Sequence, residues 1–559
     1  MIRFFAAEQM KGRLKPSESV LFQEMQGMEK ILLYDTTLRD GTQGEKINFT
    51  KDDKLKIAKK LDDLGIHYIE GGWPGATEKD TDFFAHVRNE KFVNARIAAF
   101  TSTRRSSLTP EDDPFLNAVI QSGVSVGTLF GKSWDLHVNK IFGIRLSENI
   151  DMIAESVSYL TANGIDEVIY DAEHFFDGYK DNPDYALNTI EAACMAGASA
   201  IVLCDTNGGT LPHEIAPIVE TVRNHIEKTA NRPVIIGIHT HNDTGMAVAN
   251  AIAAVQAGAT MVQGTINGYG ERCGNADLTS IIPILKLKMG YDCISDENLK
   301  KLRQVSLFVS ETANMTPLAS RPFVGKSAFA HKGGVHVSAI MKEPKAYEHM
   351  DPGLVGNERR ILVSELGGRK NIEYRARELG IPLDGDDTKS AEIISEIKRL
   401  ENEGFQFDMA DASFKILMEK LAGHFKPAFE LDSFRVTVEK DRDRPCRSNA
   451  IIKIRVDGGM EEITADEGVG PVSALDNALR KALNNLYANV LDPVHLVDFK
   501  VRVLDGREGT AARVRVLIES RDETDTWNTI GVSEDIIEAS WQALADSVQF
   551  KLDKCRSGA

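Results

Sequence analysis

The sequence predicts a closed parallel (β/α)8 (TIM) barrel, followed by helical linker subdomains and an α+β domain with two βββα units. Three observations lead to this prediction. Short apolar segments alternate with amphipathic helical segments eight times between residues 30 and 294, which is the size and rhythm of such a barrel. No Gly-x-Gly-x-x-Gly follows the first apolar segment, as the alternative open sheet would usually show. A pattern of three strands and a helix then occurs twice after residue 428.

The barrel strands are expected where short apolar runs are bounded by polar or glycine-containing segments. Amphipathic helices are expected between them, for example at Lys51–Leu64, Glu148–Ala162, Asn188–Ala196 and Gly245–Ala257. The eight expected strands are Ile31–Leu38, Tyr68–Gly72, Arg96–Thr101, Ser125–Gly131, Glu167–Glu173, Ala200–Thr206, Val234–His241 and Met261–Gly268.

The rest of the chain is expected to form three parts around the barrel domain at 30–294. Residues 1–29 are polar, lack a helix or strand period and are predicted to be a flexible leader. Residues 295–428 are predicted to be helical linker subdomains, with a Gly-rich stretch at Phe329–His336 and an acidic turn at Asp384–Asp387. Residues 429–559 hold the repeat. Its expected elements are strands Ser433–Glu439, Ile451–Val456 and Glu461–Thr464 with helix Val472–Tyr487, and strands Val497–Leu504, Ala512–Glu519 and Trp527–Val532 with helix Asp535–Leu552.

Composition excludes several classes of protein. A net charge of −17 argues against nucleic acid or an anionic membrane as a partner, because it would repel both. No apolar run approaches the roughly 18–20 residues that span a bilayer, and charged residues interrupt the first thirty positions where a signal peptide would lie. The six cysteines are scattered without paired spacing. We therefore expect reduced thiols and a cytoplasmic protein.

A metal site is predicted from residues at the carboxyl ends of the strands, where the active site of such a barrel lies. His239 and His241 are two positions apart on a strand, so their side chains point the same way. Asp40 follows the first strand and completes a two-His-one-carboxylate site with open positions for a chelating substrate. A purely structural pair of histidines is the alternative. Carboxylates and amides at the neighbouring strand ends favour the metal site.

Four further polar residues, Arg39, Asn275, His336 and Tyr347, are open to two interpretations. Arg39 could stabilise a developing oxyanion, or form an ion pair with Glu70 on the second strand; both can hold, since a carboxylate that orients the arginine supports it. Asn275 could ligate the metal or cap its loop. His336, in a loop with Gly333 and Gly334, and Tyr347, eleven residues later, could form an acid–base pair or be ordinary solvated loop residues.

Three strings of residues carry a resemblance to a known family. They are DTTLRDGTQ at 35–43, H-x-H-N-D at 239–243 and N-G-x-G-E-R-x-G-N at 267–275. Together they resemble the isopropylmalate/homocitrate/citramalate synthase family, a group of DRE-TIM metallolyases, over roughly residues 30–555. The first string alone would also fit carboxyltransferases and acyl-CoA lyases on related barrels. The resemblance implies a Claisen condensation of acetyl-CoA with a 2-oxo acid, followed by hydrolysis of the thioester.

The resemblance also implies a role for each matching residue. It assigns the divalent metal, magnesium or manganese, to Asp40, His239 and His241 with Asn275 close by or ligating; zinc and cobalt also suit such a site. It implies that Arg39 stabilises the alkoxide, Thr206 holds the substrate carboxylate and Glu173 assists the acyl group or the water. It implies that His336 and Tyr347 relay the acetyl methyl proton from the neighbouring subunit of a homodimer.

The subgroup indicates the substrate. DAEH at 171–174 and TLFGKSWD at 128–135 resemble the long-chain citramalate synthases, which use pyruvate. The C-terminal repeat resembles the LeuA-type regulatory and dimerisation domain of the family, so we expect feedback inhibition by isoleucine, with leucine as the alternative and dimerisation alone as the simpler role. The rival activities are 2-isopropylmalate synthase in leucine biosynthesis, a lyase that runs the reverse cleavage, and a non-catalytic amino-acid sensor.

Overall fold

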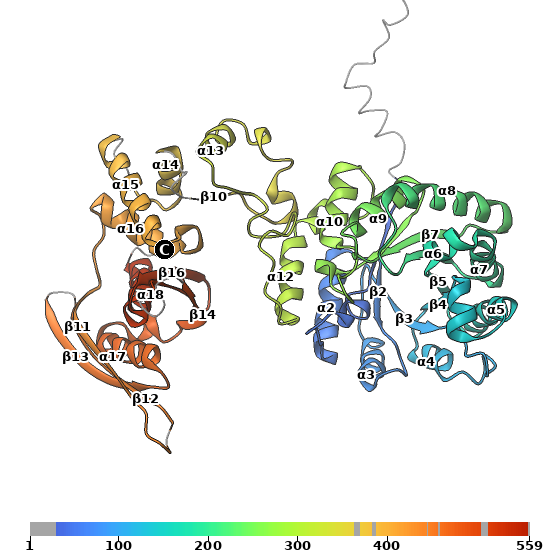
Figure 1. Cartoon of the computed structure of the whole chain (residues 1–559), viewed down its shortest axis with the longest axis horizontal. Coiled ribbons are helices and arrows are strands. Elements are labelled where there is room, and N and C mark those ends of the chain that lie inside the picture. The colour runs from blue at the N-terminus through green and yellow to red at the C-terminus, as the bar shows by residue number, and fades with distance from the viewer. Residues whose placement is uncertain are drawn as a thin grey trace, which may run out of the picture. The chain divides into compact units, whose positions relative to one another are not determined.

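The computed structural model of the protein describes residues 29–362, 369–382, 387–443, 445–456, 459–504 and 512–556. They form two compact units (Figure 1). The first runs to Phe329 and includes Asp351–Glu358; the second contains Ala330–Met350 and the chain from Arg359 onward. The predicted leader, apart from Glu29, and residues 384–386 of the predicted acidic turn lie outside the described residues.

The first unit contains a closed barrel of eight parallel strands, so the predicted fold is confirmed (Figure 1). The strands pair in chain order, and the pairing of Leu32 with Met261 closes the ring between the first and the last. The strands are β1 (Leu32–Asp35), β2 (Tyr68–Gly72), β3 (Arg96–Ser102), β4 (Val126–Lys132), β5 (Glu167–Glu173), β6 (Ala200–Asp205), β7 (Ile235–Thr240) and β8 (Met261–Gly264).

Helices alternate with these strands, and their ends follow local sequence signals. For example, Thr50 and Asp53 form a capping box at the start of α2, and Gly65 ends that helix in the left-handed conformation with φ of 96°. The helices of this unit are η1 (Asp40–Gln43), α2 (Lys51–Leu64), α3 (Glu78–Val87), α4 (Pro114–Ser122), η2 (His137–Phe142), α5 (Leu146–Ala162), α6 (Phe175–Asp181), α7 (Pro183–Ala196), α8 (Pro212–Thr229), α9 (Ala247–Gln256), η3 (Ile266–Gly268), α10 (Leu278–Pro283), η4 (Ile284–Lys288), α11 (Asp296–Leu299), α12 (Leu302–Thr312) and η6 (Pro352–Val355).

The barrel interior is packed with side chains, and its strands end earlier than the sequence predicts at two places that matter for the site. Buried residues such as Tyr34, Ile169 and Met261 fill the interior. β1 ends at Asp35, because the carboxylate of Asp35 accepts hydrogen bonds from the backbone N–H and the hydroxyl of Thr37 and turns the chain. β8 ends at Gly264, before the short helix η3. Polar residues after these ends therefore lie on loops at the carboxyl side of the barrel.

The second unit contains the two predicted βββα units. Each forms a three-stranded antiparallel sheet, in the orders β11-β12-β13 and β14-β15-β16. Ile452 and Ile454 of one sheet pack in a buried cluster with Leu479 of its helix and Trp541 of the other helix. The repeat elements are β11 (Phe429–Glu439), β12 (Arg447–Val456), β13 (Met460–Gly468), α17 (Pro471–Leu491), β14 (His495–Val503), β15 (Val514–Arg521), β16 (Thr526–Ser533) and α18 (Ile536–Arg556).

Short strands and helices precede this repeat in the second unit. They are β9 (Ala330–His331), α13 (Gly334–Ile340), η5 (Pro344–Ala346), β10 (Arg360–Ile361), α14 (Arg369–Glu378), α15 (Asp387–Glu403), η7 (Phe407–Met409) and α16 (Asp411–Ala422). Within the described parts of both units, no helix is both long and apolar enough to cross a membrane.

Candidate active site

Asp40, His239 and His241 converge at the carboxyl end of the barrel. Asp40 begins η1 after β1, His239 lies in β7 and His241 follows the last residue of β7. The Asp40 Oδ2 atom is 3.3 Å from His239 Nε2 and 3.7 Å from His241 Nε2, and the two Nε2 atoms are 3.3 Å apart. All three side chains are buried. The structure thus brings together the three residues that the sequence predicts as metal ligands.

The protonation states of this cluster suit a cation. Burial by itself would raise the pKa of the Asp40 carboxyl, but the charge of Arg39 and the neighbouring His239 hold it well below its usual range. Burial and the neighbouring His239 lower the pKa of His241 to about 4. At neutral pH Asp40 is therefore ionised, and His241 keeps a lone pair free for a metal.

A chain of hydrogen bonds fixes the tautomer of His239. Its Nδ1 atom lies 2.9 Å from Gln263 Oε1, which can only accept, so Nδ1 carries the proton and Nε2 offers its lone pair to the cluster. The Gln263 amide nitrogen donates in turn to Asp171 Oδ1 at 3.0 Å. Such outer contacts orient metal-binding histidines and raise their affinity. Gln263 is the one polar residue of β8, which is the signal that could have revealed it in the sequence.

Asn275 lies next to His241, with which it forms an isolated β-bridge. Its amide nitrogen donates to the carbonyl of Tyr269 at 3.1 Å, whereas its buried Oδ1 atom has no hydrogen-bond partner in the described part of the chain. The loop depends on glycine here, since a Cβ at Gly270 would stand 2.1 Å from the amide nitrogen of Asn275. The amide therefore caps its loop and leaves one oxygen free for a further contact, so both predicted interpretations of Asn275 are compatible with the structure.

The residues of this cluster fit a divalent metal ion. Asp40 Oδ1 and Asn275 Oδ1 are both buried and unpaired among the described residues. A buried oxygen left without a partner costs about 1–3 kcal/mol, and a cation would satisfy both. One donor atom each of Asp40, His239 and His241 lies within 4.8 Å of the others. Imidazole nitrogens with carboxylate and amide oxygens suit magnesium, manganese, cobalt or zinc.

Arg39 is held rigidly beside this cluster. Its Nε atom donates to Glu70 Oε2 at 2.5 Å, and its guanidinium carbon lies 3.8 Å from the centre of the Phe100 ring. Glu70 is fully buried and also accepts a hydrogen bond from the Tyr34 hydroxyl at 2.9 Å. Arg39 Nη1 is 3.8 Å from Asp40 Oδ2. The predicted ion pair between Arg39 and Glu70 is present. It orients the Arg39 side chain, which also lines a cavity at the cluster.

A cavity of about 230 Å³ opens at this cluster. Of the ten predicted site residues, six line it, namely Arg39, Asp40, Glu173, Thr206, His239 and His241. Glu70 and Asn275 support it as described above.

Glu173 and Thr206 each have a partner in this cavity. Glu173 forms an ion pair with Lys132, the residue paired with it at the ends of β4 and β5. Thr206 Oγ1 accepts a hydrogen bond from the backbone N–H of His174 at 2.8 Å, so its own proton is free to donate to a ligand. His174 adopts a left-handed φ of 54°, a conformation that costs energy in a non-glycine residue and is found often at functional sites.

Three aromatic side chains form another wall of the cavity: Trp73, Phe100 and Phe130. Phe100 and Phe130 stack with ring centres 5.2 Å apart, and Trp73 meets both edge-on at 5.5 and 5.7 Å. Sequence reasoning missed this wall, and it missed Lys132 and Gln263 as partners of the site. Applying the strand-end test to β2, β3 and β4 would have found Trp73, Phe130 and Lys132.

His336 and Tyr347 belong to the second unit and are not among the residues that line the cavity. Their rings stack with centres 4.2 Å apart, and both are exposed. The buried carboxylate of Glu348 beside them accepts hydrogen bonds from Arg359 at 2.6 and 2.5 Å and lies 3.1 Å from His331 Nε2. The pair is thus formed within its own unit, and its role in catalysis stays a prediction.

Three family models match successive parts of the chain. Residues 30–309 match the HMGL-like family, residues 323–404 the homocitrate synthase post-HMGL domain-like family, and residues 408–552 the LeuA allosteric (dimerisation) domain. The barrel strands fall within the first of these matches, and the repeat falls within the last except for the end of α18.

Relatives cover nearly the whole chain. The (R)-citramalate synthase of Geobacter sulfurreducens is 55% identical over 528 residues, which are 94% of this chain and 98% of that protein. The (R)-citramalate synthase of Aquifex aeolicus is 52% identical over 527 residues, with the same coverage of 94% and 98%. A probable 2-isopropylmalate synthase of Methanopyrus kandleri is only 30% identical over 523 residues, 93% of this chain and 98% of that protein. The chain therefore belongs to the isopropylmalate/homocitrate/citramalate synthase family and, within it, to the (R)-citramalate synthase group.

Proposed function

We propose that the protein condenses acetyl-CoA with pyruvate and releases (R)-citramalate and CoA, as an acyltransferase of isoleucine biosynthesis. The observation that carries this proposal is the cavity in which Arg39, Asp40, His239 and His241 meet beneath an aromatic wall. Its charged part suits the carboxylate and ketone of a 2-oxo acid. Its aromatic part suits a small methyl group better than a branched side chain.

Asp40, His239 and His241, with Asn275, would hold a divalent ion, for which we propose magnesium or manganese. When bound, such an ion supplies Lewis acidity to the carboxylate and ketone oxygens of the acceptor. Arg39 carries a charge that does not depend on pH, and Glu70 and Phe100 fix its direction. It stabilises the negative charge that develops on the ketone oxygen as the new carbon–carbon bond forms.

Two proton transfers and one hydrolysis complete the reaction. The acetyl methyl group loses a proton, its carbon bonds to the ketone carbon, and the resulting alkoxide takes up a proton. Water then adds to the thioester and CoA leaves as a thiol. We propose that the stacked pair His336 and Tyr347 removes the methyl proton. As the family resemblance implies, a second copy of the chain in a homodimer would supply this pair.

The cavity residues Thr206 and Glu173 serve the two ends of the substrates. Thr206 has a free hydroxyl proton for the acceptor carboxylate, because its oxygen already accepts from His174. Glu173 is held by Lys132 and orients the hydrolytic water or the acyl group. Each of the two side chains interacts with one residue of the protein, so it is already oriented before the substrates bind.

Regulation belongs to the second part of this proposal. We divide the chain into a catalytic barrel domain at 30–294, linker subdomains at 295–428 and a regulatory domain at 429–559, which the LeuA allosteric (dimerisation) match supports. Isoleucine is the expected inhibitor, with leucine as the alternative. Adding each amino acid to the full-length enzyme during turnover tests this, and an unchanged rate with both would remove feedback regulation from the proposal.

The test of the reaction is release of the CoA thiol from acetyl-CoA by purified protein with manganese. Pyruvate, 2-oxoisovalerate and 2-oxoglutarate are compared as acceptors. Release with pyruvate and its loss in Asp40→Ala are expected. Preference for 2-oxoisovalerate would make the protein a 2-isopropylmalate synthase with the same mechanism, and no release with any acceptor would overturn the proposal.

A further inference from the structure

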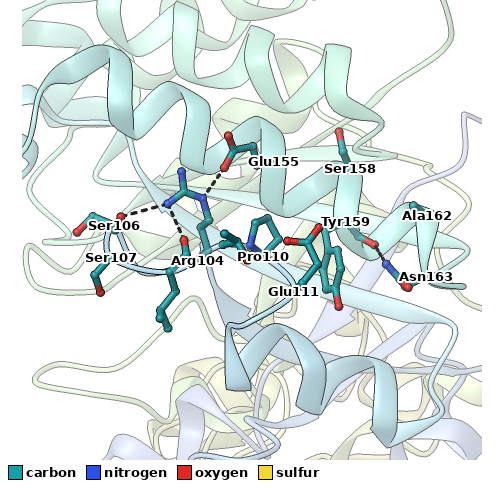
Figure 2. Close-up of a pocket in the computed structure, with 12 residues that line it drawn as sticks. Arg104, Ser106, Ser107, Pro110, Glu111, Glu155, Ser158, Tyr159, Ala162 and Asn163 are labelled. Carbon is teal, nitrogen blue, oxygen red and sulfur yellow. Dashed lines mark hydrogen bonds and ion pairs between the residues drawn. The ribbon is translucent and has the colours of Figure 1, made fainter.

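Arg104 is an example of a single charged side chain that holds a loop at the mouth of the barrel. Its Nε atom donates to Glu155 Oε2 at 2.5 Å, and its Nη1 atom donates to the carbonyl of Leu108 at 3.1 Å. Figure 2 shows the Arg104 guanidinium between Glu155 of α5 and the loop, beside a surface hollow. Arg104 is not among the described residues that line the reaction cavity, the space of about 230 Å³ at the metal-ligand cluster.

Asp177, in α6, joins the loops that follow β5 and β6. Its Oδ2 atom lies 3.0 Å from His174 Nδ1 and accepts a hydrogen bond from Asn207 Nδ2 at 2.9 Å. His174 directly follows Glu173 in the chain, and Asn207 directly follows Thr206. Glu173 and Thr206 both line the reaction cavity. One carboxylate oxygen therefore ties together the two strand ends that carry these cavity residues.

The His174 side chain is fixed by this carboxylate and by two rings. Burial would raise the pKa of Asp177, but its hydrogen bonds with His174 and Asn207 hold it below its ordinary value, so Asp177 is ionised at neutral pH. An ionised carboxylate can only accept, so His174 Nδ1 carries the proton. The centre of the His174 ring also lies 4.4 Å from that of His137 and 5.6 Å from that of Trp134.

The backbone of His174 connects this arrangement to Thr206. The His174 N–H donates to Thr206 Oγ1 at 2.8 Å. His174 has a left-handed φ of 54°, which a non-glycine residue keeps only where its surroundings hold it. Without the Asp177 contact, His174 can relax from this conformation. The Thr206 hydroxyl would then lose the donor that sets its direction.

We propose that Asp177 is a positioning residue of the condensation, which holds the Thr206 hydroxyl through His174 in the direction that the acceptor carboxylate needs. Asp177 itself is not among the described residues that line the reaction cavity. This inference rests on the proposed function, because the acceptor carboxylate at Thr206 comes from there. The carboxylate is bound before and during the reaction, so losing its contact should raise KM more than it lowers kcat.

Steady-state thiol release by the full-length enzyme, with pyruvate varied, tests this inference. Asp177→Ala should raise the KM for pyruvate about tenfold, as for the loss of one hydrogen bond to a charged group, and should change kcat by less than about threefold. Asp177→Asn keeps an acceptor oxygen and should have a KM near that of the wild type. Glu155→Ala, which removes the partner of Arg104, is the matched control and should leave the KM for pyruvate unchanged.

A double-mutant cycle with Thr206→Val separates positioning from a general loss of structure. If Asp177 acts through the Thr206 hydroxyl, Asp177→Ala should add nothing to the KM of Thr206→Val. Increases that multiply in the double variant would refute the inference. A wild-type KM in Asp177→Ala, or a KM in Asp177→Asn as high as that in Asp177→Ala, would also refute it.

Asn207→Ala provides a second variant if Asp177→Ala does not fold, since Asn207 is exposed. It removes one of the two donors to Asp177 and should raise the KM for pyruvate about threefold; an unchanged KM would count against the inference. Thermal unfolding of each variant verifies that it is folded. A wild type without thiol release would overturn the proposed function itself, whereas an active wild type whose KM does not depend on Asp177 would overturn this inference alone.

Discussion

The two halves of the barrel mouth are built on different principles. Over β1, β5, β7 and β8, polar and charged side chains are buried and tied by hydrogen bonds, as in the chain from His239 through Gln263 to Asp171. Over β2, β3 and β4, Trp73, Phe100 and Phe130 hold one another by ring contacts alone. A polar network fixes the orientation of its side chains, whereas packed rings fix the size of the cavity beside them. We therefore expect the polar half to act on the reacting atoms and the aromatic half to select which acceptor fits.

Arg39 joins the two halves, because it pairs with Glu70 and also lies on the Phe100 ring. Arg39→Ala should lower kcat by about 10²–10³-fold, the loss found when one oxyanion contact is removed. The KM for pyruvate should change less, since the charge acts mainly as the alkoxide forms. Steady-state kinetics of thiol release measure both constants.

Arg39→Lys is the control that separates charge from geometry. It keeps the positive charge but loses the planar fork that faces Glu70. A kcat close to that of Arg39→Ala would show that the direction set by Glu70 matters. A wild-type kcat in either variant would remove Arg39 from the mechanism.

Asp171 tests whether a buried carboxylate in the polar half lowers the stability of the folded protein. Burial and the neighbouring Glu70 raise the pKa of Asp171 to about 7. In the unfolded chain the same carboxyl loses its proton near pH 4, about three pH units lower than in the folded protein. Between about pH 4 and 7 the folded state therefore holds a proton that the unfolded state has lost, so the free energy of unfolding falls as the pH rises. Between pH 5 and 8, wild-type protein should lose about 2–3 kcal/mol more than Asp171→Asn, which retains an acceptor for Gln263.

Urea unfolding of EDTA-treated protein at both pH values measures this difference. Asp63→Asn, at an exposed carboxyl, should follow the wild type. If Asp171→Asn also followed the wild type, the Asp171 carboxyl would titrate near its ordinary pKa, and the contrast between the two halves would rest on the hydrogen bonds alone.

Gln263 tests the tautomer argument. Gln263→Leu removes the acceptor of the His239 Nδ1 proton, so the imidazole can turn or carry the proton on the wrong nitrogen. Manganese affinity, measured by calorimetry, should fall about 10–100-fold. Gln256→Leu at the exposed end of α9 is the control and should leave the affinity unchanged. Equal affinities in all three proteins would show that Gln263 does not orient His239.

The sequence predicted the polar half much better than the aromatic half, and the reason is physical. The two-residue spacing of His239 and His241 fixes their side chains on one face, and the carboxyl ends of parallel strands must meet, so Asp40 could be placed without coordinates. An aromatic residue near a strand end is equally typical of an ordinary core. Only the closed ring of strands shows that Trp73, Phe100 and Phe130 share one cavity.

Phe130 gives the smallest effect and the sharpest test of the aromatic half. Phe130→Leu removes the ring that stacks on Phe100 and should enlarge the acceptor side of the cavity. The ratio of kcat/KM for 2-oxoisovalerate to that for pyruvate should rise about tenfold, since each methylene in such a pocket is worth about 1–3 kcal/mol.

Phe115→Leu is the matched control, because the Phe115 ring centre lies 5.3 Å from that of Trp73, whereas Phe115 is not among the described residues that line the reaction cavity. It should leave the acceptor ratio unchanged. If both variants changed the ratio equally, a loss of packing on either side of Trp73 would alter the acceptor site. Selection of the acceptor would then depend on all the rings packed against Trp73. If neither changed it, the acceptor would be chosen by the polar half, and size would not be the criterion.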